Sequence, residues 1–157
     1  MRAFVTSVLS CDADLAWNEV QTSRLLQTVV QPLVLIRPVP GQKLPEKWSN
    51  GTTVLCRSYL LGIIPLGTRT LLFEWIDQTS HTIQTREYDS LVRRWDHIIR
   101  VESIAPGKCR YSDEIEIEAG ALTPVVWLFA LVLYRHRQNR WRPIARRLQS
   151  NRSRADG

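Results

Sequence analysis

The first part of the chain changes from a strand pattern to helical patterns. Within residues 3–10, Phe4, Thr6 and Val8 fall on one face, and this period of two predicts a strand. Two short helical patterns follow, one from near residue 13 after an aspartate and one from near residue 23 after a threonine. The expected order is therefore one strand and then two short helices.

From residue 32 to residue 118 the pattern consists of strands and turns. Asn50-Gly51 marks one tight turn, and residues 62–67, which include Pro65, mark another connection. No helical segment separates successive strands, so the pattern favours an antiparallel meander over a parallel sheet. The predicted strands cover residues 33–39, 52–61, 68–76, 81–88, 95–104 and 108–118.

A long helix is predicted from about residue 123 to residue 148, with Thr123 as its N-cap and Pro124 in its first turn. At about 1.5 Å per residue, this helix would span roughly 40 Å and cross a whole sheet. Its first half, residues 125–134, is apolar on nearly all sides. Pro143 should kink or interrupt the second half, because proline lacks the N–H that a helix interior uses.

The apolar half of this helix has a second interpretation. Residues 121–134, followed by Arg135, His136 and Arg137, resemble a membrane segment with a basic stop. The stretch contains 14 residues, including a threonine and a proline, whereas a span needs about 20. The pattern therefore favours a helix buried against a sheet.

Composition favours one domain in a reducing compartment. The 157 residues are 44% hydrophobic and 23% charged, which supports a packed core. The alternating N-terminus lacks the pattern of a signal peptide, and the three cysteines are odd in number and widely spaced. We expect a cytoplasmic protein with a ligand-binding domain over residues 1–149 and a flexible polar tail over residues 150–157.

The net charge of +6 is concentrated at the C-terminal end. Residues 135–157 contain eight arginines and one acidic residue, Asp156, so they carry +7 and the rest of the chain carries −1. A basic end on a nearly neutral body is not a basic binding face, so we expect no nucleic-acid partner. Contact of this arginine-rich end with an anionic membrane surface stays open. We expect no metal and no cofactor, because neither metal-ligand spacing nor a cofactor-binding motif is present.

Four segments carry a family resemblance. Residues 4–7 and residues 13–17, which end at Trp17, have the pattern of a first strand and helix, and residues 111–115 (YSDEI) that of a last strand. Residues 129–137 combine an aromatic-rich half with a basic half, as in a terminal helix. In these features the chain resembles an uncharacterised, bacterial-type member of the SRPBCC superfamily, which includes START domains, pollen-allergen-like proteins and polyketide cyclases.

The resemblance implies an α+β helix-grip fold. In this fold a curved antiparallel sheet of about six to seven strands wraps around a long C-terminal helix, and two short helices follow the first strand. A cavity lies between the sheet and the long helix. Polar residues on the inward faces of the strands are therefore the candidate site residues.

The last two predicted strands bring a histidine and an aspartate onto one face. His97 shares its face with apolar odd-numbered residues, and Asp113 shares a face with Tyr111. If the turn centres on Pro106, paired positions sum to about 212, and His97 and Asp113 become diagonal neighbours about 7–8 Å apart at the backbone. The pair could bind a polar ligand group or transfer a proton. The alternative is a hydrogen-bonded core histidine beside an aspartate that binds backbone.

Arg86 and Glu87 are adjacent in a predicted strand, so one of them should face the cavity. An inward Arg86 would favour an anionic ligand, whereas an inward Glu87 would need a buried partner. A solvated charge pair is the alternative. The residues predicted to contact the ligand are Trp75, Arg86, Glu87, Trp95, His97, Ile99, Tyr111, Asp113, Trp127 and Leu131.

Three functions are consistent with these features. The first is binding of a small hydrophobic or amphipathic ligand, such as a lipid or an aromatic polyketide-like compound, in the cavity. The second is a cyclase or dehydratase activity with His97, Asp113 or Tyr111 as proton-transfer groups. The third is an adaptor that meets a membrane surface or a protein through the arginine-rich end. The pattern favours binding without catalysis and carries no information on oligomeric state.

Overall fold

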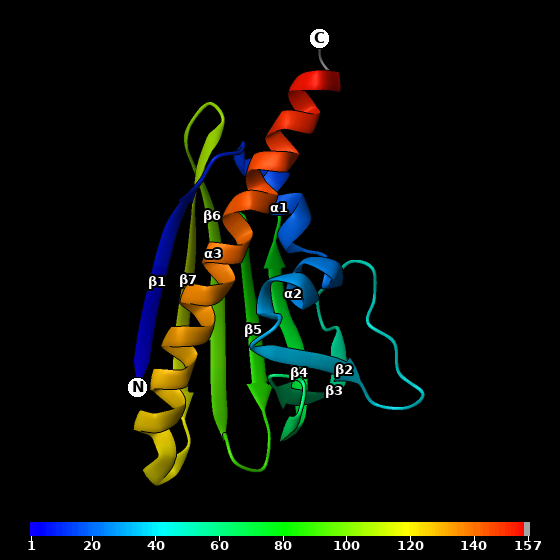
Figure 1. Cartoon of the computed structure of the whole chain (residues 1–157), viewed down its shortest axis with the longest axis vertical. Helices are drawn as coiled ribbons and strands as arrows, with labels where there is room; N and C mark the ends of the chain where they lie inside the picture. The colour runs from blue at the N-terminus through cyan, green and yellow to red at the C-terminus, as the bar shows by residue number, and fades with distance from the viewer. Residues whose placement is uncertain (156–157) are drawn as a thin grey trace.

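Seven antiparallel strands form one sheet, and the long helix α3 lies across one face of it (Figure 1). The strand order is β1-β7-β6-β5-β4-β3-β2. The computed structural model describes residues 1–155. Its strands are β1 (Arg2–Leu9), β2 (Val34–Pro38), β3 (Thr53–Leu60), β4 (Ile64–Asp77), β5 (Thr82–Tyr88), β6 (Arg94–Ala105) and β7 (Lys108–Glu118). Its helices are α1 (Ala13–Val20), α2 (Ser23–Val30), the 3-10 turn η1 (Gly120–Leu122) and α3 (Thr123–Ala155).

The architecture confirms the predicted α+β helix-grip fold, with two short helices after the first strand. Trp17 of α1 is buried in the core, and its indole N–H donates to Oε1 of Gln78 at 2.7 Å. Thr22 begins α2, since its hydroxyl oxygen accepts the backbone N–H of Leu25 at 3.1 Å. Within residues 1–155, no helix is both long enough and apolar enough to cross a membrane.

The register predicted for the last hairpin is confirmed. His97 of β6 lies opposite Ile115 of β7, and Ile99 lies opposite Asp113. The inward face of β6 alternates with its outer face over residues 95–101, as the pattern predicted. A short connection at residues 106–107 fixes this register, because few residues remain free to slip.

Strand β4 differs from its prediction in two ways. It begins at Ile64 rather than at residue 68, and Pro65 pairs with Tyr59 inside the sheet beside a register shift at Ser58. An irregular position of this kind tolerates the N–H that proline lacks. A second register shift lies between Phe73 and Trp75, and it shifts the alternation of inward and outward side chains in β4 by one residue.

Helix α3 is longer than predicted and runs without interruption through Pro143. Proline leaves the carbonyl of Asn139 without its helical partner, but Asn139 and Pro143 are both exposed, so water can solvate that carbonyl. The expected polar tail is helical up to Ala155, and the Ser150 hydroxyl donates to the carbonyl of Arg146 at 3.0 Å. Residues 156–157 of the expected tail lie outside the described residues.

Candidate functional site

The polar centre of the molecule is the carboxylate of Asp113, which is fully buried between β7 and α3. One carboxylate oxygen accepts from Nε2 of His97 at 2.8 Å and from the hydroxyl of Tyr111 at 3.2 Å. The other oxygen accepts from the amide of Gln138 at 2.8 Å, and that amide also donates to the carbonyl of Val5 at 2.8 Å. The cluster therefore joins α3 to three neighbouring strands through polar contacts.

The environment of Asp113 favours its ionised form. Burial alone would raise the pKa of Asp113, but the hydrogen bond from His97 and the positive charge of Arg137 outweigh it and hold this pKa below its ordinary value. Burial and the neighbouring Asp113 raise the pKa of Tyr111 far above its ordinary value. Tyr111 thus stays protonated and donates, and Asp113 orients the imidazole of His97.

Arg137 carries a buried positive charge beside this cluster. Its guanidinium lies over the ring of Tyr134, 4.7 Å from the ring centroid, and its Nε has no hydrogen-bond partner among residues 1–155. Burial alone would lower the pKa of Arg137, but Asp113 together with the weaker interactions of Tyr111, Tyr134 and Glu87 outweighs burial and raises it. The side chain is therefore a charged donor that lacks an acceptor at Nε, an arrangement that costs about 1–3 kcal/mol or more.

A second charged group lies on the inner side of β4 and β5. Arg69 pairs with Glu87 at 3.3 Å and with Asp89 at 2.9 Å, and its guanidinium stacks on Trp95 at 4.7 Å. The indole N–H of Trp95 donates to the hydroxyl of Tyr134 at 3.1 Å. Glu87 is therefore the inward member of the Arg86–Glu87 pair, and Arg69 is the partner it needs.

Two small cavities lie between the sheet, α2 and α3. The first, of about 60 Å³, is bounded by His97, Ile99, Tyr111 and apolar side chains of α1 and α2. The second, of about 80 Å³, is bounded by Trp95, Tyr134 and apolar side chains of β2, β3 and α3. Glu87 and Arg137 border both cavities, so the two charges stand where the cavities adjoin.

The structure places half of the predicted contact residues at these cavities. Glu87, Trp95, His97, Ile99 and Tyr111 border one or both of them. Asp113 lies behind His97 and Tyr111 and reaches the cavity only through them. Whether any of these side chains contacts a ligand stays a prediction.

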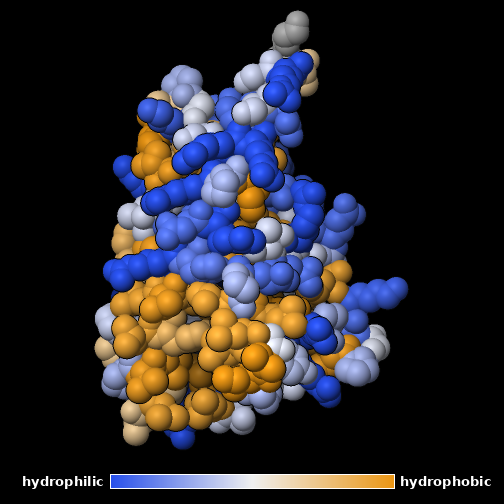
Figure 2. All heavy atoms as spheres, in the orientation of Figure 1, coloured by the Kyte–Doolittle hydropathy of each residue, from blue (hydrophilic) through white to orange (hydrophobic). Residues whose placement is uncertain are grey.

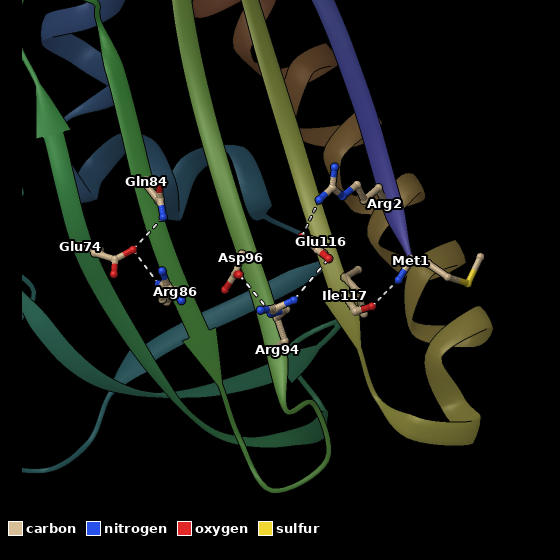
Figure 3. A network of polar contacts seen from close by, with 9 residues as sticks. All are labelled: Met1, Arg2, Glu74, Gln84, Arg86, Arg94, Asp96, Glu116 and Ile117. Atoms are coloured by element: carbon tan, nitrogen blue, oxygen red, sulfur yellow. Dashed lines mark hydrogen bonds and ion pairs between the residues drawn. The ribbon is translucent and has the colours of Figure 1, made fainter.

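Two predicted contact residues lie on the outer face of the sheet, which corrects the expectation for both. Arg86 is exposed, and its Nε donates to Glu74 at 2.6 Å (Figure 3). Trp75 is 46% exposed. Trp75 lies outside because β4 is irregular after Phe73. This irregularity places residues 74 and 75 both outside and leaves residue 76 inside.

Trp127 and Leu131 lie on a different side of α3 from the cavities, which corrects their assignment as well. The indole of Trp127 donates to the carbonyl of Arg2 at 2.8 Å, and Leu131 packs with the cluster around Ile115 and Ile117. The cavity side of α3 instead contains Phe129, Leu133, Tyr134, Arg137 and Trp141.

Arg137 is the functional candidate that the sequence pattern missed. Arg137 belongs to the arginine-rich C-terminal end, residues 135–157, yet its side chain is buried. Its spacing from buried neighbours was the available signal. Ala130, Tyr134, Arg137 and Trp141 follow each other at three or four residues, which is the spacing of one helical face.

Comparisons with known proteins identify the fold. The Zhui aromatase/cyclase from Streptomyces sp. R1128 is 12% identical, with a TM-score of 0.67 over 94% of each chain. A START superfamily protein from Mycobacterium smegmatis is 11% identical, with a TM-score of 0.65 over 94% of this chain and 98% of that one. A norcoclaurine synthase point mutant from Thalictrum flavum is 9% identical, with a TM-score of 0.68 over 92% and 93%. These likenesses confirm the SRPBCC resemblance at the level of the fold.

The sequence comparisons are less specific. No curated protein matches the chain. The model of a family described as a domain of unknown function (DUF8410) matches residues 7–145.

Proposed function

The chain belongs to the DUF8410 family, and we propose that it binds a small amphipathic ligand whose acidic group faces Arg137. Arg137 is the observation that carries this proposal, because its buried Nε has no acceptor among the described residues. An acidic group in the adjoining cavities would supply this acceptor. The apolar side chains around the cavities suit a hydrocarbon or aromatic body.

Ligand entry requires the cavities to widen. A cavity of about 150 Å³ holds benzene, and ligand pockets commonly reach about 300–1,000 Å³. Leu26 of α2 and Ile36 of β2 border both cavities. Strand β2 is at the edge of the sheet and pairs only with β3. Movement of α2 and β2 away from α3 would therefore merge the cavities at the smallest cost in backbone hydrogen bonds.

The proposal can be tested with decanoate and decanol, which share a tail and differ in charge. Indole N–H signals in nitrogen–proton correlation spectra locate the binding site, since Trp95 and Trp141 border the cavities whereas Trp75 and Trp127 do not. We expect decanoate to shift the first two signals and to bind more tightly than decanol. Shifts confined to Trp75 and Trp127 would refute cavity binding.

The matched variants are Arg137→Met and Arg147→Met, which remove one arginine each from the buried and exposed sides of α3. A charge-assisted hydrogen bond contributes about 1.5–3 kcal/mol, so Arg137→Met should weaken decanoate binding by about 10- to 100-fold and leave decanol binding nearly unchanged. Arg147→Met should retain the preference for decanoate. An unchanged preference in Arg137→Met would contradict the proposed role of Arg137.

A second candidate function is proton transfer to or from the bound ligand by His97. It is favoured by one observation: His97 borders the first cavity while its Nε2 is held by the ionised Asp113. A small molecule that co-purifies with the protein from cells would serve as the test ligand. His97→Gln should then leave the affinity for this ligand within about threefold of the native value and abolish its conversion. Mass spectrometry of that ligand after incubation would separate an enzyme from a carrier.

A further inference from the structure

One end of the molecule exposes large apolar side chains from two elements. Ile63, Ile64 and Leu66 lie in the β3–β4 hairpin, and Val125, Leu128 and Val132 lie in the first half of α3. Ile63 is 78% exposed and Val125 is 67% exposed. In Figure 2 apolar side chains gather over the lower left and centre of this face, with hydrophilic side chains at the margins. We call these six residues the apolar end; patches of this kind commonly mark a contact surface.

The arginines of α3 begin where the apolar end stops. Val125, Leu128 and Val132 are spaced as one helical stripe, and the same spacing continues to Arg135, Arg142 and Arg146, all of which are exposed. We call these three residues the arginine stripe. In Figure 2 the hydrophilic side chains lie directly above the apolar area. Arg135 is three residues beyond Val132, which is about 4.5 Å along the helix axis.

Within residues 1–155, the three arginines of the arginine stripe form no ion pair, whereas Arg152 near the end of α3 lies 3.6 Å from Asp12. Helix α3 contains eight arginines and no aspartate or glutamate over residues 123–155. The outer face of the sheet differs, because its arginines pair with acids there. Arg94 lies within 3.3 Å of both Asp96 and Glu116, for example (Figure 3). On the α3 side, the apolar end therefore adjoins the positive charge of the arginine stripe, which is unpaired among the described residues.

We propose that this face docks on the surface of an anionic lipid bilayer. The apolar end enters the boundary between headgroups and acyl chains, and the arginine stripe meets lipid phosphates. With α3 lying obliquely to the bilayer, the apolar end is buried by about 5–10 Å and the arginine stripe extends over the headgroups. Each arginine near an anionic surface raises the partition coefficient between bilayer and water by about fivefold.

A second copy of the chain fits this face poorly. If the α3 helices of two copies packed in parallel, their arginine stripes would face each other. If they packed antiparallel, each arginine stripe would lie on the partner's apolar end. Both arrangements leave charges without partners or desolvate them on an apolar surface. A bilayer instead offers an apolar layer and a layer of phosphates in the order that α3 presents them.

Docking would also give the proposed ligand a route into the cavity, although the docking proposal does not depend on that ligand. The second cavity is bordered by Leu66 of the hairpin and Phe129 of α3, so it lies between the two halves of the apolar end. A ligand with a hydrocarbon body could then pass between bilayer and cavity without crossing water.

Vesicle sedimentation of the full chain tests the docking. We expect binding to phosphatidylcholine vesicles that contain phosphatidylglycerol, weaker binding at high salt, and little binding to phosphatidylcholine alone. Ile63→Asp should reduce binding by about tenfold or more, because it puts a charge in place of an apolar side chain that docking buries in the bilayer. The matched control is Ile104→Asp in the β6–β7 hairpin, at the opposite end of the molecule (Figure 1), which should bind like the native chain.

Charge is tested separately with two double variants of equal net charge. Arg142→Gln with Arg146→Gln should reduce the partition by about 25-fold, since each arginine contributes about fivefold. Arg100→Gln with Arg110→Gln, on the outer face of the sheet, should reduce it much less. Circular dichroism and melting temperatures would establish that all four variants fold.

Several outcomes would overturn the proposal. No binding to anionic vesicles would do so, as would equal losses in Ile63→Asp and Ile104→Asp. Vesicle binding that needs the arginine stripe but survives Ile63→Asp would show purely electrostatic adsorption, without insertion of the apolar end. A dimer in light scattering that Ile63→Asp dissociates would assign the apolar end to a second copy. The decanoate experiment uses no bilayer, so the cavity proposal can fail or hold independently.

Discussion

Replacement of Asp113 tests the physical account of the buried cluster. In Asp113→Ala, the donors of His97 and Tyr111 lose their acceptor, and the Gln138 amide keeps only the carbonyl of Val5. The buried cation of Arg137 also loses a nearby negative charge. Removal of one partner from a buried ionic pair costs about 3–5 kcal/mol. Since domains are stable by only about 5–15 kcal/mol, we expect Asp113→Ala to lose most of its stability.

Two gentler variants keep the test informative if Asp113→Ala does not fold. Asp113→Asn keeps the shape and one acceptor oxygen but turns an amide N–H₂ toward one of the donors, so we expect a smaller loss than for alanine. Tyr111→Phe removes one hydrogen bond and should cost about 1 kcal/mol. Urea unfolding at pH 7, followed by tryptophan fluorescence, measures all three differences in the free energy of unfolding. Losses below 1 kcal/mol in both Asp113 variants would refute the reasoning.

The same cluster predicts a pH dependence with a definite sign. The pKa of Asp113 is lowered in the folded protein from its ordinary value of 3.8. Its contribution to stability is therefore fully present above the unfolded pKa and is lost as the pH falls through the folded pKa. We expect native stability to decline below about pH 4, and Asp113→Asn to show less of this decline. An identical acid dependence in both proteins would contradict the assignment.

Three further predictions concern single side chains. Arg69→Ala should lose about 3 kcal/mol in urea unfolding, because it leaves two neighbouring acids without their cation, and a loss below 1 kcal/mol would contradict the pairing. Trp95→Ala removes a buried aromatic side chain and should lower the free energy of unfolding by about 3–5 kcal/mol. Trp75→Ala removes a half-exposed one and should lower it by less than about 1 kcal/mol. Equal losses would contradict the outward position that the bulge in β4 gives Trp75. Burial raises the pKa of Cys56 to about 11. At pH 8, iodoacetamide should therefore alkylate Cys56 more than about 100-fold more slowly in the native protein than in the urea-unfolded protein. Equal rates, measured by mass spectrometry, would refute this.

The sequence predicted the fold and the position of His97 relative to Asp113. Both residues belong to strands joined by a very short connection, and the period of two along each strand fixed which side chains share the inner face. This information is local, because it depends on a few adjacent residues and one turn. The order of strands and helices was likewise written in the alternation of apolar positions.

The face of Arg86 and Glu87 could not be read from their own strand. Adjacent residues of a regular strand point to opposite sides, and only pairing with β4 and β6 decided that Glu87 is inside. Trp75 was assigned to the inner face because its strand alternates up to Phe73. The bulge that reverses the alternation arises from pairing with β5, which is a contact between segments and leaves no period of its own in the sequence.

The rotation of α3 about its axis was also a tertiary outcome. Residues 125–134 are apolar on nearly all sides, so no stripe indicates which side faces the sheet, and Trp127 was as plausible a cavity residue as Phe129. Contacts with β1 and α2, more than 90 residues earlier in the chain, set the rotation and brought Arg137 inside. By itself the sequence determined which elements form and how neighbouring strands align, since those depend on local periods. Only the packing of distant elements decided which arginine is buried, which apolar residues remain outside, and so where a ligand or a bilayer could bind.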